Sequence, residues 1–321
     1  MKRQQYSGGS EEEGVKKPLN AFLGELFIGS FNEEGGTGET RMVCEQVSHH
    51  PPVTASYIWN TSTGVRAEGY AGQTITIAKP SFNVTIEQSG HTLLFYDEFQ
   101  EAYLVTLPGL TVKSLLSGTP YPELIGTSYI VSSTGFTSKI EYEGKGMFGS
   151  GQKNAFKASL YQTSKPDNVL FEAEGTWNDK FAFYDVRDGK RKEVESYDTA
   201  TFKPVPLTIN PLEQQDPWES RRAWADTIAG IKANDWDKTS QAKNKLEEAQ
   251  RELRRQREQK NETWEPALFR TVEQDPVYDA LAKGINWTED KSRTMGVWKF
   301  DLEKAGSRQS PYHGDAKPDL S

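Results

Sequence analysis

Two adjacent imidazoles stand at the end of a predicted strand, within residues 45–52 (EQVSHHPP). Pro51 favours an extended conformation at His50, and neither proline of the motif can donate a hydrogen bond to a neighbouring strand. The strand must therefore end here and present His49 and His50 together. Protonated imidazoles donate from both ring nitrogens, so the pair is suited to binding a phosphate. Two ordinary surface histidines at a strand end are the alternative interpretation.

Two further segments carry charges that could serve an anion site. Residues 16–25 (KKPLNAFLGE) place a basic pair before a proline, followed by an apolar run that contains an asparagine and a glutamate. On a predicted helix from 239 to 260, Lys243, Glu247 and Arg251 share one face, each about 6 Å further along the axis. A solvated lysine pair and a salt-bridged row are the ordinary interpretations of these two segments. The same cations could instead hold an inositol phosphate headgroup.

Enzymatic and metal-binding motifs are missing from the sequence. The four histidines and Cys44 have no standard zinc-ligand spacing, and no nucleophile elbow, phosphate-binding loop or dinucleotide fingerprint occurs. Cys44 lies in an apolar strand pattern, where a buried and inert thiol is the usual outcome. A phosphoinositide phosphatase or a lipid hydrolase is therefore disfavoured, and we expect no catalytic residue, no metal and no cofactor.

The elements that must position these residues are mostly strands. Short runs alternate polar with β-branched or aromatic residues, at 40–47, 54–60, 73–79, 83–88, 92–97, 102–107, 127–133, 136–144, 155–162 and 168–175. Glycine, proline, asparagine and aspartate separate the runs. Since no helical pattern intervenes, we expect an antiparallel sheet that curls into a barrel or a sandwich. Residues 107–126 interrupt the alternation and are expected to cover one edge or end of the sheet.

The hydrophobic period changes to that of a helix at Asp216. This carboxylate precedes Pro217, and Glu219 follows, which is typical of a helix start. The apolar stripe of the helix 239–260 is too thin for full burial. We divide the chain into a flexible tail (1–15), a β core (16–209), a helical part packed on it (210–304) and a second flexible tail (305–321).

The composition fits a cytosolic globular protein. The chain has 321 residues, a net charge of −8 and 11% aromatic residues, so a disordered chain and a general nucleic-acid binder are both disfavoured. No apolar stretch approaches the roughly 18 residues of a membrane span, and no secretory h-region follows Met1. A single cysteine excludes an intramolecular disulfide and fits a reducing compartment.

The motif at 45–52 also resembles that of the oxysterol-binding-protein-related family of lipid-transfer proteins. The resemblance extends to KPLNAFLGE at 17–25, SYIVSSTG at 128–135, PLEQQDPWESR at 211–221 and LEEAQRELR at 246–254. These segments span most of residues 16–300. The sequences of these motifs are most similar to those of the short fungal members, which lack extra targeting domains.

This resemblance implies a nearly closed antiparallel β-barrel that encloses a lipid tunnel, with helices at its C-terminal side. It also implies that a phosphatidylinositol 4-phosphate headgroup binds at the barrel mouth. The residues that match the family's headgroup ligands are Lys17, Asn20, Glu25, His49, His50, Lys243, Glu247 and Arg251. They belong to the three segments already singled out, so both lines of reasoning indicate one anion site.

Two departures from the family pattern concern the sterol half of the expectation. Only 16 residues precede Lys17, so the lid over the tunnel mouth is expected to be absent. Sterol-binding relatives often have asparagine after Gly-Tyr, where this chain has Ala71. Gln88 matches another member of the polar network around the sterol hydroxyl, and we assign it to the sterol tunnel.

The expected function is exchange of a sterol for phosphatidylinositol 4-phosphate between membranes. A phosphoinositide-binding protein with a non-sterol second ligand, or a lipid sensor or scaffold that transfers nothing, are the alternatives. The expected partners are membrane lipids, contacted transiently by a peripheral monomer without a transmembrane segment. The expected location is the cytoplasm, at endoplasmic reticulum, Golgi or other organelle membranes.

Overall fold

A 14-stranded sheet forms the body of the protein, in a computed structural model that describes residues 19–32, 36–78, 83–114, 119–144, 151–285, 287 and 289–319. The hydrogen-bonded order is β13-β12-β11-β10-β9-β8-β6-β5-β4-β3-β2-β1-β14, and β7 pairs with β5 and β8 beside this path. Neighbouring strands in the path are nearly all consecutive in sequence, which is the meander that the period of two predicts. A second sheet has two strands, β15 and β16.

The strands of the main sheet are β1 Leu26–Asn32, β2 Glu39–His49, β3 Pro52–Asn60, β4 Val65–Ala78, β5 Asn83–Tyr96, β6 Glu101–Thr106, β7 Gly109–Lys113, β8 Tyr121–Ser132, β9 Phe136–Glu143, β10 Ala155–Gln162, β11 Val169–Thr176, β12 Lys180–Asp185, β13 Lys192–Asp198 and β14 Leu207–Thr208. The C-terminal strands and the helices are α2 Ser220–Ala223, α3 Ala225–Lys232, α4 Trp236–Lys260, β15 Phe269–Val272, α5 Pro276–Lys283, β16 Val297–Phe300 and α6 Leu302–Ser307.

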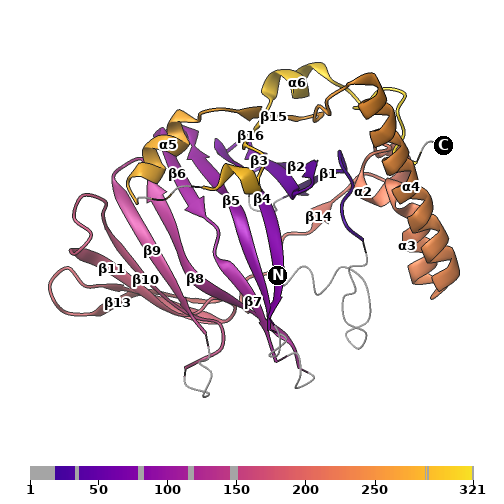
Figure 1. Ribbon diagram of the computed structural model, residues 1–321. Coiled ribbons are helices and arrows are strands. Elements are labelled where there is room, and N and C mark those ends of the chain that lie inside the picture. Colours follow the sequence, from indigo (N-terminus) through magenta and orange to yellow (C-terminus); the bar gives the residue numbers. More distant parts are fainter. Residues whose placement is uncertain are drawn as a thin grey trace.

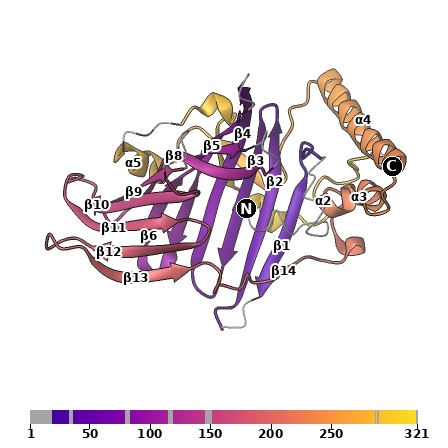
Figure 2. The same ribbon diagram turned by 90° about the horizontal axis from the view of Figure 1, so that it is seen from below.

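The antiparallel sheet expected from the sequence is confirmed, with differences in detail. The runs 83–88 and 92–97 belong to one long strand, β5. Residues 107–126, expected to cover an edge, instead contribute β7 and the start of β8 to the sheet. The sheet is strongly bent, and β10–β13 run across the direction of β2–β5 (Figure 2).

The two faces of the sheet differ in burial. Along β5, His91, Leu93 and Phe95 are buried, whereas the alternating Thr92 and Leu94 stay partly exposed. The buried set faces the C-terminal part of the chain, whose α5 and β16 lie over this side of the sheet (Figure 1). We call this side the outer face and the opposite side the inner face.

The outer face packs in two clusters. Under α5, Leu93, Leu104 and Val131 meet Tyr278 and Leu281. The larger cluster joins β1–β4 to α2, α4, β15 and β16 through buried aromatic and aliphatic side chains, among them Leu26, Val53, Tyr70, Trp218, Trp224, Leu246 and Phe269. Burial of this kind of surface stabilises a fold by about 25 cal/mol per Å². The elements from α2 to β16 therefore belong to the same folded unit as the sheet, and we call them the C-terminal wall.

The helix expected from Asp216 begins later and is divided in two. Asp216 and Glu219 bind each other: the Asp216 amide donates to Glu219 Oε1 at 2.7 Å, and the Glu219 amide donates to the Asp216 carbonyl at 2.9 Å. The Trp218 amide also donates to Asp216 Oδ1 at 2.9 Å. These bonds satisfy amides of the turn that precedes α2 rather than of the helix itself. α2 then ends at Ala223, and α3 starts after Trp224.

The end of the chain packs on the helical part. Residues 308–319, which we call the C-terminal strap, follow α6 within the segment expected to be a flexible tail. Ala316 accepts a hydrogen bond from Trp218 Nε1 at 2.8 Å, and Pro318 accepts one from Gln250 Nε2, also at 2.8 Å. In the described part of the chain, no helix combines the length and apolar character needed to cross a membrane.

Candidate lipid-binding site

The inner face is lined by small and apolar side chains. Strand register places Cys44, Ser56 and Gly69 side by side on neighbouring strands. The same face carries partly exposed apolar residues from β1 to β9, which are Phe27, Met42, Ile58, Leu94, Val105, Ile130 and Ile140. An apolar face that a protein leaves accessible marks a binding surface for an apolar partner.

A cavity of about 340 Å³ lies on the inner face of β9–β13. Its lining includes Ala158, Leu160, Phe171, Ala173 and Phe183. The two alanines are directly opposed on β10 and β11, so the wall is hollowed where large residues would otherwise meet. The volume falls in the ordinary range of ligand pockets, roughly 300–1,000 Å³. This part of the inner face can accept an apolar ligand.

β2 ends at His49, as the two prolines predict, and His50 lies in the turn that follows. Their rings lie 4.5 Å apart in an edge-to-face arrangement, and the His49 Nδ1–H donates to the Ala21 carbonyl at 3.1 Å. This donor fixes the proton on Nδ1 and leaves Nε2 for another partner. Burial lowers the pKa of His49, and the nearby charges of His50 and Arg254 add to the effect. His49 is therefore neutral near pH 7 when no anion is bound.

The segment before β1 reaches the same place. Ala21 contacts His49, and Asn20 beside it is exposed. Glu25 faces the helical part, where it accepts from the Phe22 amide at 3.1 Å, from Trp224 Nε1 at 3.0 Å and from the Ser220 hydroxyl. The geometry gives Glu25 a role in shaping this loop. Lys17 lies outside the described residues.

The charged face of α4 forms a row of ion pairs, which the sequence analysis gave as the ordinary interpretation of these residues. Lys243 Nζ lies 2.7 Å from Glu247 Oε1, and Arg251 lies 4.0 Å from the same carboxylate while it also contacts Glu248. Glu247 and Arg254 are close enough to His49 to influence its pKa. The structure thus brings the β2 end, the 19–25 loop and α4 together.

Arg254, which the sequence reasoning did not single out, is close enough to His49 to lower its pKa. Its side chain is 59% exposed and pairs with Glu258 at 3.5 Å, so it can turn toward an incoming anion. Its position three residues after Arg251 on the same helix was a usable signal, because such residues share a face.

Gln88 lies on the inner face of β5, opposite Gln73 of β4. Its Nε2 donates to the Pro108 carbonyl at 2.6 Å, which holds the amide near the turn between β6 and β7. One register step on from this pair, Gly72 faces Ser89, and Ala71 then faces Gly90. Gln73 and Gln88 thus add two amide groups to an inner face that also carries the hydroxyl groups of Ser56 and Thr92.

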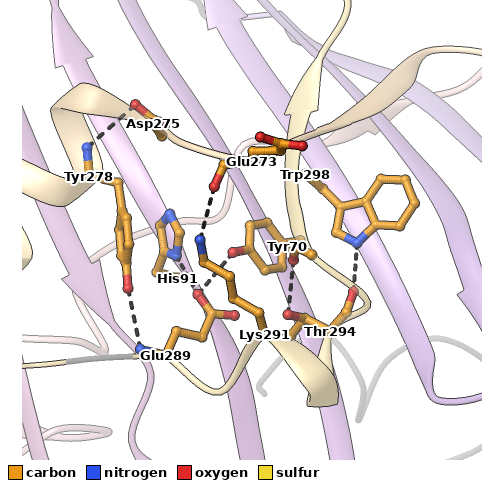
Figure 3. Close-up of polar contacts among 10 residues, drawn as sticks. Tyr70, His91, Glu273, Asp275, Tyr278, Glu289, Lys291, Thr294 and Trp298 are labelled. Atoms are coloured by element: carbon orange, nitrogen blue, oxygen red, sulfur yellow. Dashed lines mark hydrogen bonds and ion pairs between the residues drawn. The ribbon is translucent and has the colours of Figure 1, made fainter.

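Two buried polar groups on the outer face were not anticipated. Glu45 is fully buried and accepts from the Ala267 and Leu268 amides at 2.6 and 2.8 Å. His91 Nδ1 and the Tyr70 hydroxyl both lie 2.9 Å from Glu289 Oε2 (Figure 3). Both groups tie strands to the C-terminal wall. Their partners are over 190 positions away, so local spacing carries no signal of them.

The reactive groups considered in the sequence were Cys44 and a metal site. Burial raises the pKa of Cys44 to about 11, so its thiol stays protonated and unreactive near pH 7. Among the residues that the structure describes, no three or more His, Cys, Asp or Glu side chains gather as a metal site would require.

Comparison with known proteins places these features in one family. A sequence model described as Oxysterol-binding protein matches residues 4–230 and 226–304. The probable transporter efuK of Hormonema carpetanum is 46% identical over 99% of this chain, which spans only 45% of that protein's length. Protein kes1 of Schizosaccharomyces pombe is 40% identical over 88% of this chain and 72% of its own length.

Solved structures share the fold. The Osh1 ORD domain in complex with ergosterol has a TM-score of 0.67 at 21% identity, covering 90% of this chain and 69% of the other. The Osh3 ORD of Saccharomyces cerevisiae in complex with PI(4)P has a TM-score of 0.59 at 24% identity, covering 80% and 68%. This chain belongs to the oxysterol-binding protein family, whose members are non-enzymatic lipid-transfer proteins.

Proposed function

We propose that this chain exchanges a sterol for phosphatidylinositol 4-phosphate between membranes, holding either lipid on the inner face of its sheet. The observation that carries the proposal is one sheet that has an accessible apolar face and an imidazole pair at the end of β2, with the charged helix α4 near His49. An amphipathic lipid needs both, because its chain requires apolar burial and its phosphate requires paired charge.

The headgroup half rests on charge. A phosphate monoester carries close to two negative charges at neutral pH. In this proposal His49 and His50 donate from the end of β2, and Lys243 and Arg251 donate from α4, whose Glu247 is close enough to His49 to influence its pKa. Asn20 is exposed beside Ala21, whose carbonyl binds His49. Lys17 and Glu247 complete the proposed set, with Glu25 shaping the loop.

The sterol half rests on the inner face. A cavity of about 340 Å³ and the half-exposed aliphatic side chains give a rigid apolar molecule a place to lie. Gln88 and Gln73 offer amide groups that a single hydroxyl could reach. A non-sterol lipid with one polar group would fit the same description, so lipids extracted from the purified protein should be identified by mass spectrometry.

Extraction of phosphatidylinositol 4-phosphate from liposomes tests the headgroup site. We expect the double variant His49→Ala, His50→Ala to lose at least about 30-fold in affinity, since removing partners of a desolvated charge typically costs 2–5 kcal/mol. Lys180→Ala on β12 is the matched control, because this lysine is 70% exposed and far from the mouth in sequence. An affinity unchanged in the double variant would contradict the assignment.

The pH dependence of headgroup binding gives a second test. A bound phosphate raises the lowered pKa of His49, so binding takes up a proton and strengthens as pH falls from 8 toward 6. The headgroup's own ionisation near pH 6 opposes this trend. We therefore expect a steeper pH profile for the unmodified chain than for His49→Gln, and equal profiles would exclude protonation of His49.

The transfer function implies a peripheral and transient encounter with organelle membranes from the cytoplasm, by a monomer. A fluorescent transfer assay between donor and acceptor liposomes separates this function from a sensor or scaffold. A chain that binds phosphatidylinositol 4-phosphate without accelerating its transfer would be a sensor.

A further inference from the structure

The C-terminal strap packs on the loop that leads into β1. Asp216 Oδ2 accepts from the Ser310 hydroxyl at 2.7 Å and from the Tyr312 amide at 2.9 Å. With the bonds to Trp218 and Gln250, these contacts join the strap to the turn before α2 and to α4. The strap thus contacts both the turn before α2 and α4, the helix that carries Lys243 and Arg251 of the proposed headgroup site.

His313 is the strap residue that reaches the loop. Its ring lies 4.3 Å from that of Trp218 and 4.9 Å from that of Trp264, measured between centroids. It also forms a hydrogen bond with the Gly24 backbone. The Nε2 atom is buried without a hydrogen-bond partner in the described part of the chain, which favours the neutral ring.

Gly24 connects the His313 contact to the region around His49. Its amide donates to the Gln46 carbonyl at 2.8 Å, which places the loop beside β2 three residues before His49. Its φ of +82° suits glycine, and a Cβ there would approach Trp264 to 2.5 Å. The loop then presents Ala21 to His49 at 3.1 Å. A continuous series of contacts therefore runs from His313 to the imidazole pair.

We propose that the strap holds the 20–25 loop in its headgroup-binding conformation, and that His313 is a positioning residue that acts through the Gly24 backbone. This inference rests on the proposed function for its effect on lipid. The contact between strap and loop can be tested without any lipid.

Electrostatics supports a pH-dependent strap. Burial lowers the pKa of His313 to about 4, and the charges of Arg308 and Arg257 act in the same direction, while Asp216 opposes them. Because the folded pKa is depressed, the contribution of His313 is complete above the ordinary value of 6.5 and declines as pH falls toward 4. The strap should loosen on acidification.

Hydrogen exchange of the full-length chain provides the lipid-free test. We expect residues 20–26 to exchange about tenfold faster in His313→Ala, which corresponds to losing a hydrogen bond and its packing. His313→Gln can still donate to the Gly24 carbonyl and should stay within about threefold of the unmodified chain. Lys317→Gln, at an exposed strap position, is the matched control.

The pH profile distinguishes positioning from general stabilisation. Between pH 7 and pH 5, exchange at 20–26 should accelerate beyond its chemical rate in the unmodified chain but not in His313→Gln. Exchange that rises equally throughout His313→Ala, with a matching loss of global stability, would overturn the positioning role. Unchanged exchange at 20–26 would overturn the contact itself.

Lipid extraction then tests the consequence. His313→Ala should weaken extraction of phosphatidylinositol 4-phosphate about tenfold, and His313→Gln should restore most of it. Normal extraction by His313→Ala would overturn the link to headgroup binding. If the unmodified chain extracts no phosphoinositide, the proposed function fails, and exchange at 20–26 alone decides whether the strap holds the loop.

Discussion

Glu45 joins β2 to the C-terminal wall through a carboxyl group that has no contact with solvent. Burial raises its pKa from 4.5 to about 7, although the Leu268 and Ala267 amides oppose the shift. A raised folded pKa contributes stability that is present below about pH 4.5 and lost as pH rises through 7. The effect is at most about 3 kcal/mol.

Urea unfolding at pH 5, 6, 7 and 8 would measure this contribution. We expect Glu45→Gln to be less stable at pH 5, because an amide can accept only one of the two amide donors. The difference from the unmodified chain should shrink by about 1–3 kcal/mol at pH 8. A difference that does not change with pH would show that Glu45 does not titrate in this range.

At the residue scale, sequence reasoning found what was local and missed what was not. His49 and His50 follow from two prolines that end a strand, and β2 does end at His49. Glu45 lies in the same motif, yet its partners Ala267 and Leu268 are more than 200 residues away. No spacing rule reports such a contact, because it exists only once the C-terminal wall has docked.

At the scale of the element, Glu247 of α4 can act in two ways: as an ion-pair partner within the helix and as part of the proposed headgroup site. Glu247 pairs with Lys243 and Arg251, and such partly exposed pairs contribute only about 0.5 kcal/mol each. We expect Glu247→Gln to change unfolding free energy by less than about 1 kcal/mol. Headgroup affinity should fall about threefold to tenfold, because the two cations lose the carboxylate that positions them.

Liposome extraction beside chemical unfolding would separate these effects. Glu252→Gln is the matched control, since Glu252 pairs with Arg255 on the same helix and is not among the proposed ligands. Tighter headgroup binding in Glu247→Gln would show that Glu247 competes with the phosphate for its cations.

Helices were predicted correctly where a single sequence pattern was present. The prediction was wrong where a capping motif and core packing favoured different helix boundaries. α4 spans Trp236–Lys260, close to the predicted 239–260, because Asp235 caps its start and Leu246 and Ala249 are buried at helical spacing. The Asp216 turn carries a capping motif, but Trp218 and Trp224 are both buried in the core. Tertiary packing of these rings fixes the interruption between α2 and α3, which helix-start rules do not contain.

At the scale of the whole molecule, we expect sterol binding to depend on the hollow between β10 and β11. Ala158 and Ala173 face each other across the strands and line the cavity. Ala158→Trp should occupy much of this volume and reduce sterol extraction at least about tenfold, with a smaller effect on the headgroup site. Sterol and phosphoinositide extraction by one protein preparation would measure both, with Ala158→Ser as the control of similar size. Normal sterol uptake by Ala158→Trp would place the sterol elsewhere.

The alternation of burial along β5 shows that the two faces of the sheet serve different purposes: one packs in the core and the other stays accessible. His91, Leu93 and Phe95 are buried by other parts of the protein, whereas Thr92 and Leu94 on the inner face stay partly exposed. Cargo that binds only the folded state adds RT ln(1 + [L]/Kd) to its stability, so the empty and the loaded protein should melt at different temperatures. Substitutions at inner-face positions such as Thr92 and Leu94 do not change the side chains that pack in the outer-face core. The same scaffold could therefore acquire a new cargo through inner-face changes alone, without rebuilding the core that keeps it folded.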